Sequence, residues 1–205
     1  MRHQLRLTIS LCLLATVAVA ADWPTFRHDN GRSGATTESL ALPLTPLWTI
    51  SPRQPPLPSW PNPERERPRT RFDDVFHVAI ARSTIFFGSS ANGAVYAVDA
   101  ATGTVRWTFI TGGAIRLAPT VWEGRVYVTS DDGSAYCLAA IDGTLLWQRQ
   151  AAITAQHVIG HGRMISAQPP RAGILVANEV AYFACGIFPT EGVGLFAVDA
   201  RTGEP

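Results

Sequence analysis

The feature of this sequence that most constrains its fold is a short segment that occurs three times. The first copy spans residues 97–107 and reads AVDAATGTVRW, and the second spans residues 137–147 and reads CLAAIDGTLLW. A spacing of about 40 residues predicts repeated units of four short strands. The third copy starts at Ala197 and stops at Pro205 before its tryptophan. We therefore expect the chain to be the N-terminal part of a longer protein.

Each unit divides into four short runs of apolar, β-branched and aromatic residues, separated by turns that carry glycine or aspartate. The second unit has its runs at 118–122, 125–130, 134–139 and 144–147, and the first has them at 78–81, 85–89, 94–99 and 105–109. This order predicts an all-β chain of four-stranded antiparallel sheets around one axis, a β-propeller. We expect seven or eight blades in the whole protein and about three blades here.

The repeated segment resembles the pyrroloquinoline-quinone (PQQ) type of propeller repeat, in which Ala-x-Asp-x-x-x-Gly-x-x-x-Trp spans the third and fourth strands of a blade. The matching residues are Ala97, Asp99, Gly103 and Trp107, then Gly143 and Trp147, then Ala197, Asp199 and Gly203. The resemblance covers roughly residues 22–205. It implies that each tryptophan packs between neighbouring blades and that each glycine gives its turn a positive φ. The second copy has Ala139 in place of the aspartate, which leaves the docking hydrogen bonds of its turn open.

We interpret these repeated residues as structural. Large aromatic side chains that recur once per blade fill the wedge between twisted sheets, and burying one contributes on the order of 3 kcal/mol. Asp99 and Asp199 fit turn positions whose carboxylates accept backbone hydrogen bonds. The repeat therefore predicts a fold and assigns no catalytic residue.

Residues 1–20 predict an export signal. A basic start is followed by an apolar core and by the small residues Ala18 and Ala20. We expect a Sec-type signal peptide cleaved near Ala20 and a periplasmic or secreted protein at 21–205. The apolar core is shorter than the roughly 20 residues of a membrane-spanning helix. Leu11 precedes Cys12, where a lipoprotein signal would place a small residue, so we do not expect lipidation.

Composition excludes some classes of partner. The formal net charge is +1, with acids and bases interspersed, so there is no basic stripe for nucleic acid and no polybasic anchor for a membrane. Cys137 and Cys185 lie in apolar, strand-like runs. They fit either a disulfide or two buried free thiols, and we do not interpret them as a metal site.

Two segments interrupt the repeat. Residues 51–74 are rich in proline and then in charge, and prolines at this density cannot join a central sheet. We expect a surface loop, with a solvated connector preferred over a ligand for an aromatic groove. Ahead of it, residues 46–50 resemble the last strand of a blade whose other strands are missing, which in a closed propeller completes the final blade.

The second interruption, residues 153–171, contains His157, His161 and Arg163. Glycines at 160 and 162 break any helix that would bring the two histidines to one face, so we predict no metal site there. A loop of this length at a propeller face is nevertheless a better place for function than any strand residue. Residues 162–193 are also similar to exported propeller proteins of planctomycete type.

The sequence is most consistent with an exported, non-catalytic scaffold whose loops bind a protein or a small molecule. The resemblance implies one alternative, a dehydrogenase that holds PQQ and Ca²⁺ on the propeller axis, and a second, an outer-membrane assembly factor. The first strands of the units are nearly all apolar, so we expect this region not to bind PQQ by itself. The residues that could contribute to a cofactor site are His77, Arg116, His161 and Arg163. A site for PQQ with Ca²⁺ would therefore need the full-length protein.

Overall fold

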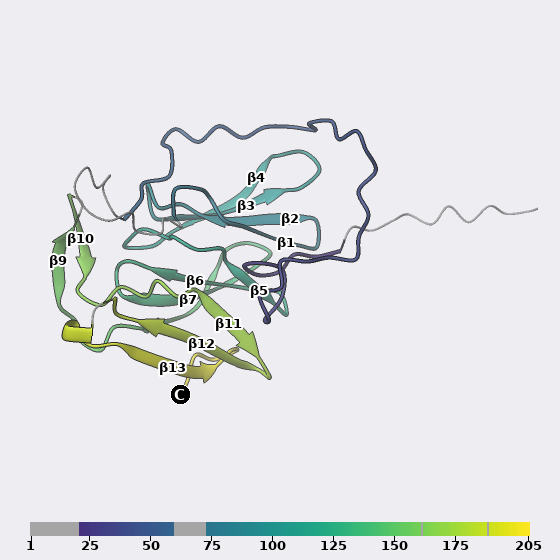
Figure 1. The fold of residues 1–205 in the computed structure, drawn as a ribbon. Helices are drawn as coiled ribbons and strands as arrows, with labels where there is room; N and C mark the ends of the chain where they lie inside the picture. The colour runs from purple at the N-terminus through teal and green to yellow at the C-terminus, as the bar shows by residue number, and fades with distance from the viewer. Residues whose placement is uncertain (1–20, 60–72, 161, 188) are drawn as a thin grey trace, which may run out of the picture.

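The computed structural model describes residues 21–59, 73–160, 162–187 and 189–205. Within these ranges the chain is all-β apart from one short 3₁₀ helix, η1 (Pro189–Glu191). Three antiparallel sheets lie side by side, as Figure 1 shows, and each corresponds to one unit of the sequence repeat. The arrangement is that of a partial propeller, which confirms the predicted fold class. No helix in the described ranges has the length and hydropathy of a membrane span.

The three sheets are blades in which consecutive strands are neighbours. Blade 1 contains β1 (Val78–Ala81), β2 (Thr84–Gly88), β3 (Ala94–Asp99) and β4 (Val105–Ile110). Blade 2 contains β5 (Thr120–Trp122), β6 (Arg125–Ser130), β7 (Ser134–Ala139) and β8 (Leu145–Gln150). The described part of blade 3 contains β11 (Ile174–Ala177), β12 (Val180–Cys185) and β13 (Gly194–Asp199).

The predicted strands agree with these bounds to within a few residues. β5 begins after Pro119, which has no N–H to donate to a strand ladder. β8 continues through Gln148 to Gln150, beyond the apolar pattern, because an outer strand exposes one of its faces. The core lies between the blades. Between blades 1 and 2 it includes Phe86, Val95, Ile115, Val126 and Leu138, and between blades 2 and 3 it includes Tyr127, Cys137, Ile174, Phe183 and Val198.

A tryptophan from the outer strand of one blade docks on a hairpin turn of the next. The indole Nε1 of Trp107, on β4, donates to the carbonyl oxygen of Ala140 over 3.0 Å. Gly143 lies in the same turn with a φ of 76°. A Cβ atom at Gly143 would lie 2.6 Å from the ring of Trp107. Glycine is therefore needed twice, for the backbone conformation and for the close approach of the indole.

This docking contact is repeated along the chain. The equivalent sets are Trp147 with Ala200 and Gly203, and Trp48 with Ala100 and Gly103. Residues 46–50 belong to no strand of the described chain, yet Trp48 occupies the position of an outer-strand tryptophan on blade 1. This placement fits the interpretation of the segment as the last strand of a preceding blade.

The substitution at Ala139 leaves the second turn well ordered. Its backbone N–H donates to the carbonyl oxygen of Thr144 over 2.8 Å, as the N–H of Asp99 does to that of Thr104. The carboxylate of Asp142 accepts from the N–H of Thr144 at 3.0 Å. The hydrogen bonds that close this turn come from the main chain and from a different aspartate, so the missing Asp does not affect docking.

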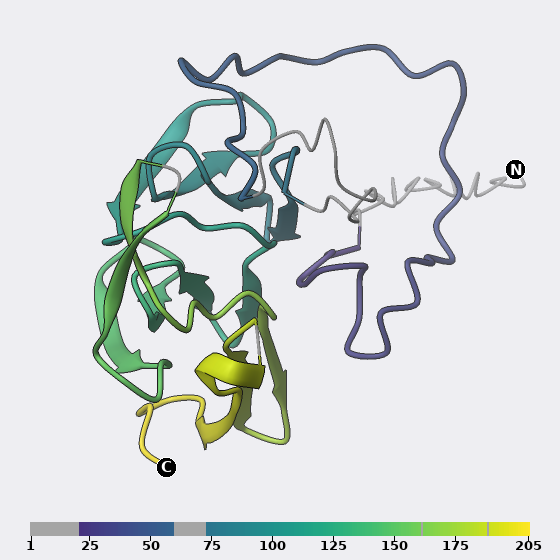
Figure 2. The same cartoon turned by 60° about the vertical axis from the view of Figure 1, so that its left-hand side comes forward.

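The insert at residues 153–171 is not only a loop. It contains a hairpin of β9 (His157–Gly160) and β10 (Arg163–Ser166), which form a separate two-stranded sheet. Figure 1 shows this hairpin at one side of the three stacked sheets, and Figure 2 shows it from a second direction. Ile159 pairs with Met164 and Val158 with Ile165, and the β-branched residues among these favour strand pairs.

Replacement of Gly143 by alanine tests the docking contact. Gly124→Ala is a matched control, because Gly124 also has a positive φ of 73° but has no atom within 4 Å of its Cβ position. The left-handed conformation costs about 1–2 kcal/mol in both variants. Crowding of the indole should cost Gly143→Ala about 1–3 kcal/mol more. Urea unfolding measures the difference, and equal losses of stability in the two variants would contradict the docking role.

Candidate functional site

The two segments that interrupt the repeat meet at one pocket of about 530 Å³. Its wall has three sources, which are the proline-rich segment, the connections within and between blades 1 and 2, and the β9–β10 hairpin. The lining includes Leu57, Ser90, Ala91, Gly112, Gly113, Arg116, Asp131, Arg163, Met164 and Ile165. The pocket therefore does not belong to any single blade, and the repeat alone would not produce it.

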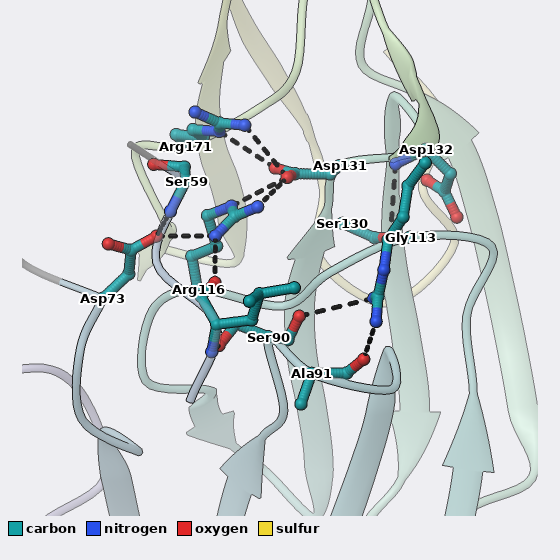
Figure 3. A network of polar contacts seen from close by, with 12 residues as sticks. Ser59, Asp73, Ser90, Ala91, Gly113, Arg116, Ser130, Asp131, Asp132 and Arg171 are labelled. Atoms are coloured by element: carbon teal, nitrogen blue, oxygen red, sulfur yellow. Dashed lines mark hydrogen bonds and ion pairs between the residues drawn. The ribbon is translucent and has the colours of Figure 1, made fainter. Parts of the chain in front are cut away.

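A buried ion-pair network lies beside the pocket. Arg116 places Nη1 2.6 Å from Asp73 Oδ2 and Nη2 2.6 Å from Asp131 Oδ2. Arg171 contacts the same Asp131 carboxylate at 3.0 Å. Figure 3 shows Arg116 between the two aspartates, with Arg171 also directed at Asp131. Two cations and two anions thus neutralise one another, and the side chain of Asp131 is only 1% exposed.

The network joins segments that are far apart in sequence. Arg116 lies in the connection from β4 to β5, Asp131 follows β6 directly, and Arg171 lies before β11. Asp73 lies before blade 1 and accepts the backbone N–H of Ser59 at 2.7 Å. A single cluster therefore connects the first two blades, the start of the third and the proline-rich segment.

The proline-rich segment is held against the blades at Leu57. The backbone N–H of Leu57 donates to Ser90 Oγ at 2.9 Å, and its carbonyl oxygen accepts from Arg116 Nη1 at 3.0 Å. Ser59 and Asp73 are each 1% exposed. The expectation of a solvated connector is wrong for Ser59 and Asp73, which are buried, whereas residues 51–55 are exposed as a connector would be. Trp60 and the charged run at 64–72 lie outside the described residues.

The structure brings two of the four predicted site residues together. Arg116 is buried in the wall of the pocket, and the exposed Arg163 lies at the hairpin and donates to the carbonyl oxygens of Ser90 and Ala91. His77 is not part of the pocket lining, and its ring contacts Phe26 with the centroids 5.4 Å apart.

The two histidines of the insert do not form a described site. His157 is exposed and its Nδ1 lies 3.0 Å from the carbonyl oxygen of Ala155, whereas His161 lies outside the described residues. Across the described ranges, no group of three or more His, Cys, Asp or Glu side chains is arranged to hold a metal ion.

Sequence reasoning missed Asp73, Asp131 and Arg171. The Asp-Asp-Gly turn after β6 gave a reason to treat both aspartates as turn formers. Only Asp132 has that role, since its carboxylate accepts from the N–H groups of Ser134 and Gly112, both at 2.8 Å. Asp131 is then left for the two arginines. The usable signal was that Arg116 and Arg171 both stand shortly before the first strand of a blade.

The aspartates of the repeat have turn contacts in the structure. Asp99 Oδ1 accepts from the N–H groups of Ala101 and Thr102 at 3.0 and 2.9 Å. A hydrogen bond from the Arg106 guanidinium, together with those from Thr102, lowers the pKa of Asp99 to about 2. Asp199 accepts in the same way from the N–H groups of its own turn, which lowers its pKa. These carboxylates are charged turn residues.

Both cysteines are buried free thiols. Cys137, on β7, has no exposed surface, and Cys185, at the end of β12, is 1% exposed. Burial raises the pKa of the Cys137 thiol to about 12. The sequence left open either a disulfide or two buried free thiols, and in the structure the two cysteines are unpaired.

Thiol labelling tests this assignment. Without denaturant at pH 8, a thiol reagent such as DTNB should react with neither cysteine, because both are buried and the Cys137 thiolate is disfavoured. In guanidinium chloride, both thiols of the chain from Ala21 should react without prior reduction. Labelling that appears only after a reductant is added would show a disulfide instead.

Replacement of Arg116 by methionine tests the network. The change leaves Asp73 without its buried guanidinium partner and Asp131 with only one, which should cost about 3–5 kcal/mol of unfolding free energy. Arg106→Gln is the control, because it removes the exposed pair with Asp99 and should change stability little. Urea unfolding of both variants checks the difference, and similar losses would show that the network is not structural.

Comparisons with known proteins agree with this fold. A protein-family profile described as outer membrane protein assembly factor BamB matches residues 45–205. No curated protein sequence matches the chain significantly. A quinohemoprotein alcohol dehydrogenase from Comamonas testosteroni has a similar structure, with a TM-score of 0.55 and 18% identity, and the match covers 93% of this chain and 27% of that protein.

Two further solved structures match less closely. A europium-containing methanol dehydrogenase has a TM-score of 0.49 and 16% identity over 62% of this chain and 23% of its own. BamB from Moraxella catarrhalis has a TM-score of 0.37 and 16% identity over 66% of this chain and 62% of its own. The chain spans only about a quarter of the length of these dehydrogenases. Because the profile covers most of the sequence, the chain belongs to the family described as outer membrane protein assembly factor BamB, a family of PQQ-like β-propeller repeats.

Proposed function

We propose that this chain is part of an exported, non-catalytic scaffold that binds a partner on the pocket face of its propeller. The observation that carries the proposal is the pocket itself, which is built where both interruptions of the repeat meet. Segments that depart from a repeat on one face are where repeat proteins place their binding residues. The volume of about 530 Å³ falls in the usual range of ligand sites, about 300–1,000 Å³.

The described pocket residues do not fit PQQ and its calcium ion. The quinone is an anionic tricarboxylate that needs several free cationic groups, and Ca²⁺ needs carboxylate and amide oxygens. The Arg116 donors are already used by Asp73, Asp131 and the carbonyl oxygen of Leu57. Asp131 in turn is shared by two arginines. These groups stabilise one another and are not available to a cofactor. Arg163 is then the pocket arginine that no described carboxylate pairs, which is fewer cationic groups than the quinone needs.

The family description supports one form of this scaffold, a factor that takes part in assembly of outer-membrane proteins. Such a role needs a binding surface and no reaction, which suits a pocket whose buried charges are neutralised internally. Export to the periplasm or the medium is part of the proposal and depends on the sequence of residues 1–20, which lie outside the described residues. The quinoprotein dehydrogenase is the competing function, and its cofactor groups would come from elsewhere in a full-length protein.

Titration with PQQ in the presence of Ca²⁺ separates the two functions. The purified full-length protein that contains this chain should show no micromolar binding in quinone absorbance or calorimetry. Arg163→Ala and the control Arg82→Ala, on the opposite β1–β2 turn, should give the same flat titration. Micromolar binding by the full-length protein would replace the scaffold with the dehydrogenase. Its loss in Arg163→Ala, but not in Arg82→Ala, would make this pocket part of the cofactor site.

A further inference from the structure

The pocket face already holds one extended stretch of polypeptide. Leu57 lies between prolines at 56 and 58, and both of its main-chain polar groups are bound by the blades. Ser90 Oγ accepts its N–H at 2.9 Å, and Arg116 donates to its carbonyl oxygen at 3.0 Å. This is how a protein recognises an extended peptide, through the main chain and independently of most side chains.

The open part of the pocket continues beside this segment. Its walls combine the apolar side chains of Leu57, Met164 and Ile165 with the glycine-rich connection at Gly112 and Gly113. The N–H of Gly112 is already bound to Asp132 and the carbonyl oxygen of Gly113 to Thr111, so the aliphatic side chains supply the contacts to residues of similar kind. The lining is therefore suited to an extended chain with aliphatic side chains.

The charged side chain at the pocket rim favours one class of ligand. Arg163 is exposed and donates to the carbonyl oxygens of Ser90 and Ala91, which are neutral acceptors. No ion pair within the described residues includes Arg163, whereas Arg116 and Asp131 are neutralised inside the network. A guanidinium that no described carboxylate pairs favours an acidic group on the ligand, because charge-assisted pairs with carboxylates are strong and directional.

The hairpin offers a second means of binding an extended chain. β9 and β10 pair with each other in a sheet of only two strands, so each keeps an edge outside the described sheet. Unpaired strand edges are the sites at which proteins add a strand from a partner. Ile159 and Met164 are opposite each other and are 82% and 60% exposed. This exposed apolar pair stands next to the pocket rim.

We propose that the pocket binds an extended segment of a partner protein in which an acidic side chain is flanked by aliphatic ones. Arg163 contacts the carboxylate, Leu57, Met164 and Ile165 contact the aliphatic side chains, and the hairpin edge bonds to the main chain. This inference rests on the proposed scaffold function and specifies its ligand.

Peptide binding by fluorescence anisotropy tests the proposal. The probes are three fluorescein-labelled peptides, Ser-Val-Glu-Val-Ser and its Gln and Lys counterparts at the central position, added to the chain from Ala21. The Glu peptide should bind at least about tenfold more tightly than the Gln peptide. Arg163→Gln should remove that preference, Arg163→Glu should transfer it to the Lys peptide, and Arg82→Gln, on the opposite face, should leave it unchanged.

Three outcomes would overturn the inference. The first is equal affinity of the Glu and Gln peptides for the unchanged protein, and the second is a Glu preference that survives Arg163→Gln. The third is competition by glutarate that matches the Glu peptide at equal concentration, which would indicate a small carboxylate ligand. Thermal melts of the Arg163 variants should match that of the unchanged chain, since Arg163 is exposed. If the peptides show no Glu preference and the protein does not bind quinone, only the peptide inference is wrong. If the protein binds quinone, the scaffold function itself is wrong.

Discussion

The structure depends on the contact between a tryptophan and the glycine turn of the next blade. An indole N–H fixed on a carbonyl oxygen sets the distance between neighbouring sheets, and the missing Cβ of Gly143 allows the ring of Trp107 to approach. Three such contacts occur in the described chain. Each blade presents one apolar face to each neighbour, so this contact sets how the buried layers between blades align. The positions of the connections near the axis depend on that alignment.

The ion-pair network has a different role from these docking contacts. Docking occurs at the hairpin turns, where the repeat is regular, whereas Arg116 and Arg171 act at the connections between blades. Burying four charges is costly, and a cluster of this kind is weak support for stability in itself. Its contribution is geometric, since it ties together the connections that carry these four groups. The network thereby fixes the pocket wall to which Leu57 is bound.

The fold could be predicted from the sequence because its determinants are local. The Gly103 and Gly143 turns and the alternation within strands each depend on a few neighbouring residues. Trp107 and Trp147 repeat this local pattern in successive units. The site could not be predicted in the same way. Asp73 and Asp131 meet at Arg116 across 58 positions of sequence, and no local pattern distinguishes Asp131 from its neighbour in a turn. The hairpin at 157–166 was likewise hidden, because two glycines near its turn are equally typical of a loop.

The pocket draws its walls from residues as distant as Leu57 and Ile165, so it exists only when blades 1 and 2, the proline-rich segment and the hairpin are all in place. Bringing together residues so far apart in sequence costs conformational entropy. A molecule that binds there interacts with the assembled state alone and stabilises it by mass action. A bound ligand would thus stabilise the packing between blades. An occupied pocket would show that blades 1 and 2, the proline-rich segment and the hairpin have come together.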